Sequence, residues 1–162
     1  MVEDKLLIWK FKLGDKDALR RIYEKYKNDM LKLAIALLNN INTAKDVVEE
    51  VFTAFAQSAA TIRVNGSLKS FLSICVANRI RNTKRDSKRH EASDIDESQG
   101  IVCQNRRPEQ WVMLNEEMEL LSKALAQIPY EQREVLTLYM QGDMTFSHIA
   151  TIQKTSVNTV QG

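Results

Sequence analysis

The side chains best suited to a chemical role lie in a basic run from Arg79 to Arg89. At helical spacing, the cationic and amide side chains of this run fall along one side of a helix. Cations neutralise phosphates, and an asparagine amide can read a base edge. The run therefore predicts a nucleic-acid surface, made of Asn78, Arg81, Asn82, Arg85, Lys88 and Arg89. The alternative is a solvated helix end, because cations also suit a helix C-terminus.

A second candidate for nucleic-acid binding lies near the end of the chain. Thr145 can cap a short helix that reaches about Ile152, and Ser156 can cap another helix after a tight turn. This order is typical of a DNA-binding helix-turn-helix, although a plain helical hairpin would give the same pattern. Lys154 weakens the case, because a non-glycine residue at a left-handed turn position costs about 1 kcal/mol.

A third candidate is acidic. Asp46, Glu49 and Glu50 fall on one exposed face of a predicted helix, beside an apolar stripe that includes Val47 and Val51. The face can simply keep the helix soluble, or it can dock a basic or mixed protein partner.

Helices must position all three groups, because the 162 residues include only 5 glycines and 2 prolines. Apolar residues at helical spacing predict four helices in the first half of the chain. Gly14 is expected to end the first and Asp15 to cap the second. The predicted helices are Leu6 to Leu13, Ala18 to Leu38, a third that Thr43 opens with Asp46 in a capping box, and a fourth from Leu68.

We expect an all-α protein with two small helical domains. Residues 1–90 would form a four-helix bundle and residues 109–162 a helix-turn-helix domain. Residues 91–108 are polar and lack periodicity, which predicts a flexible linker. In the second domain, a corner at Ile128-Pro129 precedes a helix from about Tyr130 to Gln141, which Gly142 can end.

Composition argues against several other classes. The two cysteines, Cys75 and Cys103, are too few for a disulfide framework, and no spacing suits zinc. No apolar run is long enough to span a bilayer, and the acidic start is unlike a secretory signal. We therefore expect a cytoplasmic protein. We find no phosphate loop, nucleophile elbow or metal motif, so we expect that it is not an enzyme and has no cofactor.

Taken together and in order, these motifs resemble extracytoplasmic-function (ECF) sigma factors. The likeness covers nearly the whole chain apart from the linker. The segments similar to region two are Gly14-Asp15 to Tyr26, Asp46 to Phe52 and Phe71 to Asn78. The segments similar to region four are Ala124 to Pro129, Arg133 to Leu136, Phe146 to Ala150 and Ser156 to Val160.

The resemblance implies a sigma factor that binds core RNA polymerase and directs it to promoter DNA. Polymerase clamp helices would be bound by Asp46, Glu49, Glu50 and Phe52. The non-template strand of the minus-ten element would be bound by the fourth helix and by Arg63, Asn65, Ser67 and Lys69 in the preceding loop. The minus-thirty-five duplex would be read by Thr155, Ser156, Asn158, Thr159 and Gln161, in a region that also touches the polymerase flap. Many family members have an anti-sigma partner, which this sequence does not identify.

The chain departs from the family pattern at several positions. Glu49 stands where Gln is usual, Ala56 near a usual Trp, His148 for Glu and Lys154 for Gly. The family's recognition helix runs on beyond the position of Gly162, so we expect impaired minus-thirty-five binding by the chain as given. Two other functions stay open, a stand-alone DNA-binding regulator and a decoy that occupies polymerase without full promoter recognition.

Overall fold

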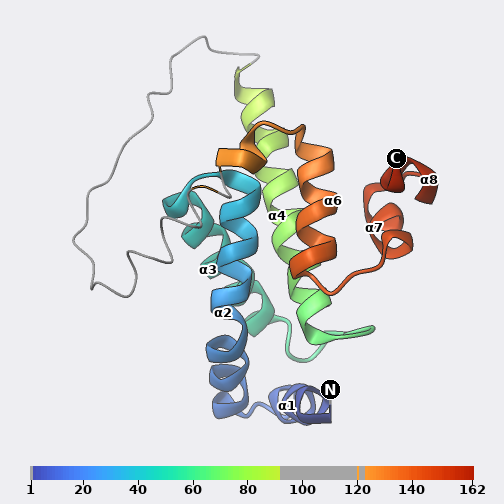
Figure 1. Cartoon of the computed structure of the whole chain (residues 1–162). Coiled ribbons are helices and arrows are strands. Elements are labelled where there is room, and N and C mark those ends of the chain that lie inside the picture. The colour runs from blue at the N-terminus through green and yellow to red at the C-terminus, as the bar shows by residue number, and fades with distance from the viewer. Residues whose placement is uncertain (1, 92–119, 121–122) are drawn as a thin grey trace.

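The computed structural model describes residues 2–91, 120 and 123–162, with the side chains of all of these except residues 86–91. The ordered elements of this part of the chain are helices, and no strand occurs among them (Figure 1). They are α1 (Val2–Lys12), α2 (Lys16–Leu38), α3 (Ile41–Gln57), α4 (Leu68–Glu91), α6 (Tyr130–Gln141), α7 (Phe146–Gln153) and α8 (Val157–Gln161). The prediction of an all-α fold is confirmed.

Local sequence explains where the first helices begin and end. Gly14 turns the chain at a φ of 87° after α1, and the Asp15 carboxylate accepts from the backbone N–H groups of Asp17 and Ala18 to start α2. The predicted start of α3 at Thr43 is wrong. Asn40 caps this helix instead, because its side chain accepts from the backbone N–H groups of Asn42 and Thr43.

The core of the N-terminal bundle forms around α2, which packs against α1, α3 and α4. Its buried face carries apolar side chains at helical spacing, including Ile22, Met30 and Leu33, each with no exposed surface. A stacked Phe11–Phe55 pair, with ring centroids 4.9 Å apart, ties α1 to α3. The bundle buries the apolar stripes that the sequence predicted.

Helix α4 is one continuous helix as far as Glu91, which confirms that the basic run is helical. Leu72, Val76 and Ile80 are completely buried against the bundle. The opposite flank of α4 therefore faces outward and carries the polar residues of the run.

The C-terminal helices pack against the bundle. Helix α6 lies alongside α2, and α7 and α8 lie beyond it (Figure 1). Arg133 of α6 donates to the carbonyl oxygen of Leu37 at 3.2 Å, and Ser70 of α4 donates to the carbonyl oxygen of Gly142 at 3.0 Å. The predicted linker at 91–108 and the start of the second domain near 109 lie outside the described residues, apart from Glu91, which belongs to α4.

Candidate nucleic-acid interface

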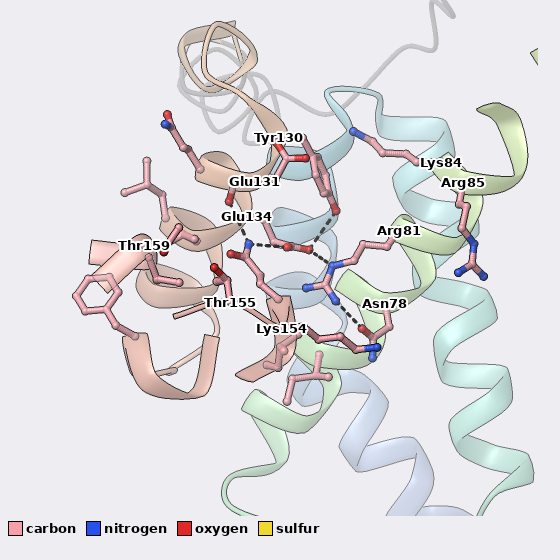
Figure 2. A pocket seen from close by; sticks show the side chains of 18 of the residues that line it. Asn78, Arg81, Lys84, Arg85, Tyr130, Glu131, Glu134, Lys154, Thr155 and Thr159 are labelled. Carbon is pink, nitrogen blue, oxygen red and sulfur yellow. Dashed lines mark hydrogen bonds and ion pairs between the residues drawn. The ribbon is translucent and has the colours of Figure 1, made fainter. Parts of the chain in front are cut away.

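The outward flank of α4 carries amide and cationic side chains in the predicted order. Asn78, Asn82 and Arg85 are exposed, whereas Arg81 is only 27% exposed at its side chain. The Arg81 guanidinium donates to the Asn78 side-chain oxygen at 2.9 Å through Nη1. Figure 2 shows Arg85 pointing away from Arg81's contacts. The side chains of Lys88 and Arg89 lie outside the described residues.

Arg81 forms an ion pair with a carboxylate from the C-terminal half of the structure, which consists of α6, α7 and α8, whereas α1 to α4 form the N-terminal half. Its Nε donates to Glu134 Oε1 at 2.8 Å, and Glu134 on α6 is only 2% exposed (Figure 2). Glu134 also accepts from the Tyr130 hydroxyl at 3.2 Å and from Gln153 Nε2 at 2.8 Å. A buried carboxylate needs such donors to offset its lost hydration.

Two aromatic features extend this network. Burial, together with the negative charge of Glu134, raises the pKa of Tyr130, so its hydroxyl keeps the proton that it donates. The Lys84 ammonium of α4 lies 3.7 Å from the centroid of the Tyr130 ring, which is cation–π geometry. Helix α4 therefore contacts α6 through two cations, Arg81 and Lys84.

The loop before α4 divides into exposed and structural residues. Arg63 and Asn65 are exposed, and Gly66 turns the chain at a φ of 85°. The Ser67 hydroxyl accepts from the Ser70 backbone N–H at 3.0 Å, so it caps α4. Lys69 Nζ lies 3.5 Å from Asp29 Oδ2. Of the four predicted loop residues, Arg63 and Asn65 are the freest to meet a ligand.

The helix-turn-helix forms as predicted. Thr145 caps α7, Ser156 caps α8 through the Thr159 backbone N–H at 3.1 Å, and Lys154 makes the turn with a φ of 55°. Ile149 and Ala150 are buried, which lets the two helices approach closely. Thr155, Ser156, Asn158, Thr159 and Gln161 are all exposed.

The two predicted nucleic-acid surfaces face a common groove. One wall comes from α4 and the other from α6, the α7–α8 turn and α8 (Figure 2). Its α4 wall includes Asn78, Arg81, Asn82, Lys84 and Arg85. Its other wall includes Tyr130, Glu131, Glu134, Lys154, Thr155, Thr159 and Gln161. The sequence did not predict that these two surfaces would line the same groove.

The acidic face of α3 is partly available. Asp46, Glu49 and Glu50 are exposed, and Glu50 pairs with Arg79 of α4, whose hydrogen bond holds the pKa of Glu50 below its usual value. Phe52 is 6% exposed and meets the Tyr23 ring edge-on at 5.0 Å between centroids. The Phe52 side chain is therefore a packing group, contrary to its predicted place on a docking surface.

Sequence reasoning missed Glu134 as the partner of Arg81, and it missed Tyr130 and Gln153 as the other donors to Glu134. The sequence did contain a signal for this contact, because Glu134 falls on the same face of α6 as the apolar residues Val135 and Leu138, which are buried. A carboxylate on a buried face calls for a cationic partner. Among the residues that the structure describes, no three His, Cys, Asp or Glu side chains gather to hold a metal ion. None of these helices is long and apolar enough to cross a membrane.

The fold places the chain among all-helical proteins that carry a helix-turn-helix. Residues 22–90 match the family Sigma-70 region 2. Over 160 residues the chain is 25% identical to the ECF RNA polymerase sigma factor SigW of Bacillus subtilis, spanning 93% of this chain and 84% of SigW. Over 146 residues it is 21% identical to the RNA polymerase sigma factor YlaC of the same organism, spanning 90% and 84% of the two chains.

A solved structure shares the fold. The structure of CnrH in complex with the cytosolic domain of CnrY superposes with a TM-score of 0.68 at 18% identity, over 99% of this chain and 88% of that one. Residues 22–90 therefore carry a Sigma-70 region 2 domain, and nearly the whole chain is similar to RNA polymerase sigma factors, including the ECF-type SigW.

Proposed function

We propose that this sigma factor binds core RNA polymerase and directs it to promoters, with the outward flank of α4 seating the non-template strand of the minus-ten element. The observation that carries this is the two-sided character of α4. Leu72, Val76 and Ile80 are fully buried on one side, and Asn78, Asn82 and Arg85 are exposed on the other. Exposed guanidinium and amide groups in a row suit a phosphate backbone with some base contact.

Other surfaces complete the proposed contacts. Arg63 and Asn65 would extend the strand-binding surface from α4 into the preceding loop, and the exposed start of α8 would meet the minus-thirty-five duplex. The exposed carboxylates of α3 would dock on the polymerase clamp. The likeness to CnrH, solved with CnrY, supports a protein partner of the anti-sigma kind. We also propose that the protein works in the cytoplasm, where polymerase acts.

Reconstitution with purified core polymerase tests the function directly. The chain should co-elute with core and support transcription from a subset of promoters. Tight binding to duplex operator without polymerase would favour a stand-alone regulator. Binding to core without any transcription would favour a decoy. Absence of binding to core would overturn the proposal.

The role of α4 can be measured by salt dependence. In the double variant Arg81→Ala/Arg85→Ala, affinity for single-stranded DNA should fall. The log–log salt slope should become less negative by about 0.7 for each phosphate that the variant no longer neutralises. Arg20→Ala is the matched control, because Arg20 pairs with Glu24 on the exposed surface of α2. An unchanged slope in the double variant would refute the phosphate contacts.

A further inference from the structure

The guanidinium of Arg81 already binds an anion in this structure, the carboxylate of Glu134. A carboxylate and a phosphate both accept charge-assisted hydrogen bonds from guanidinium groups. The Glu134 carboxylate holds Arg81 Nε at 2.8 Å, and a terminal nitrogen of Arg81, Nη2, is buried without a hydrogen-bond partner. The group that α4 would offer to DNA is therefore occupied and mostly buried.

The shielding extends beyond one pair. Lys84 is covered by the Tyr130 ring, and Asn78 is engaged by Arg81 at 2.9 Å. Across the groove, Thr155, Thr159 and Gln161 of the helix-turn-helix line the wall opposite α4. A DNA strand lying along α4 and a duplex lying against α8 would each need this space. The docked arrangement therefore places part of each proposed DNA surface on the same groove.

Apolar and polar contacts together hold the C-terminal helices to the bundle, because Val135, Leu138 and Ile149 belong to the same buried core as α2 and α4. Besides Arg81–Glu134, the polar contacts include Arg133 to the Leu37 carbonyl oxygen and Ser70 to the carbonyl oxygens of Gly142 and Asp143, at 3.2, 3.0 and 3.2 Å. Polar groups that separate are rehydrated, so a buried ion pair adds little net stability relative to its separated and solvated partners. The polar part of the interface can therefore be exchanged for water at little net cost, whereas the shared apolar core favours the docked state.

We propose that the C-terminal helices mask the DNA-binding flank of α4, with Glu134 as an internal competitor for the guanidinium of Arg81. This inference rests on the proposed function of α4 and adds its regulation. Opening releases Arg81 and Lys84 together. DNA and the docked state exclude each other, so any ligand that favours the open state also raises DNA affinity.

Two variants open the mask at separate positions along α4, near its start and near its middle. Glu134→Gln removes the charge that holds Arg81 and keeps an oxygen that can accept from Tyr130 and Gln153. Ser70→Ala removes the donor to the Gly142 carbonyl oxygen and leaves the surroundings of Glu134 unaltered. Glu131→Gln is the matched control, because Glu131 is an exposed carboxylate three residues before Glu134 on α6 and lines the same groove.

Opening and binding are measured separately on the whole chain. Spin labels on Lys45→Cys of α3 and His148→Cys of α7, with Cys75→Ala and Cys103→Ser, report the distance between the halves. Fluorescence anisotropy with a short single-stranded DNA of mixed sequence reports affinity. In both opening variants the distance should lengthen and DNA should bind about threefold or more tightly, because apparent affinity scales with the open fraction. Glu131→Gln should show only the small general effect of removing one negative charge.

Different failures have different meanings. If the distance lengthens and DNA affinity does not rise, while wild type binds DNA through Arg85, the mask is refuted and the proposed function stands. If neither variant changes the distance or the affinity, the contacts do not hold the halves together and the mask is also refuted. If no form binds DNA even when open, the proposed function of α4 fails, and the inference that rests on it falls too.

Discussion

Lys154 occupies the left-handed turn between α7 and α8, at a φ of 55° and a ψ of 42°. This conformation crowds a Cβ atom against the following carbonyl oxygen. Lys154→Gly should therefore stabilise the protein by about 0.5–1 kcal/mol in urea unfolding, even after the larger chain entropy of glycine is counted. Lys154→Ala controls for the missing charge and should gain nothing comparable. Equal stability of the glycine and alanine variants would show that the turn is not strained.

Residue-level predictions from sequence succeeded where the cause is local. Asp15, Thr145 and Ser156 cap helices because each bonds to backbone groups two or three residues away. Asn40 was missed as a cap because it lies in an asparagine-rich stretch that also ends the preceding helix. The partner of Arg81 could not be found this way, since Glu134 lies 53 positions along the chain.

At the scale of elements, α1 is held to α2 by a partly buried charged cluster. Asp4 accepts from Lys25 Nζ at 2.8 Å and from the Tyr26 hydroxyl at 2.9 Å. Burial alone would raise the pKa of Asp4, but these two hydrogen bonds outweigh it and lower the pKa below 3.8. Burial and the bond to Asp4 raise the pKa of Tyr26 to about 12.

The sign of the pH dependence follows from the lowered pKa of Asp4. The unfolded chain binds the proton more tightly, so the stabilisation is present above the ordinary pKa of 3.8 and is lost as the pH falls below it. Asp4→Asn should lower the free energy of unfolding at neutral pH by about 1–2 kcal/mol and flatten its fall in acid. Urea unfolding across the acid range measures both effects.

An exposed pair provides the control for Asp4. Glu24 and Arg20 are 52% and 74% exposed at their side chains, so Glu24→Gln should cost less than about 1 kcal/mol at neutral pH. Equal losses in the Asp4 and Glu24 variants would mean that the hydrogen bonds to Asp4 contribute nothing beyond a surface ion pair.

Element-level predictions succeeded for helices with a clear apolar stripe. Helix α4 was predicted from the spacing of Leu72, Val76 and Ile80, and its polar flank followed from that spacing. The sequence did not predict which helices pack together across the two halves. Arg133, for example, donates to a backbone carbonyl oxygen of α2. Every residue has a carbonyl group, so the pattern of side chains does not indicate which one will accept.

At the scale of the whole molecule, the predicted arrangement of two domains joined by a linker leaves the contact between them unspecified. The structure places the polar flank of α4 against α6, so one surface serves both internal packing and the proposed DNA contact. Each half can be predicted from its own periodicity. Their docking depends on apolar and polar contacts between residues far apart in sequence, which periodicity does not report.

The docked halves should separate as one unit, which makes a quantitative prediction for a double variant. Ser70 and Arg81 lie on the same helix, about 16 Å apart at 1.5 Å per residue. At this separation the free-energy changes for opening in Ser70→Ala and Glu134→Gln should add to within about 0.5 kcal/mol in the double variant. The fractions of open and docked molecules in the spin-label distance distribution give these energies.

Additivity is informative because the two contacts do not touch. If α6, α7 and α8 detach together, removing either contact shifts the same equilibrium, and Ser70→Ala raises DNA affinity although it leaves Arg81 and Glu134 intact. If they detach piece by piece, Ser70→Ala frees only the α6–α7 connection and leaves DNA binding at Arg81 unchanged. Ser147→Ala, at an exposed serine of α7, should alter neither measurement. An affinity gain confined to Glu134→Gln would therefore show that the mask is local to Arg81 rather than a property of the docked half.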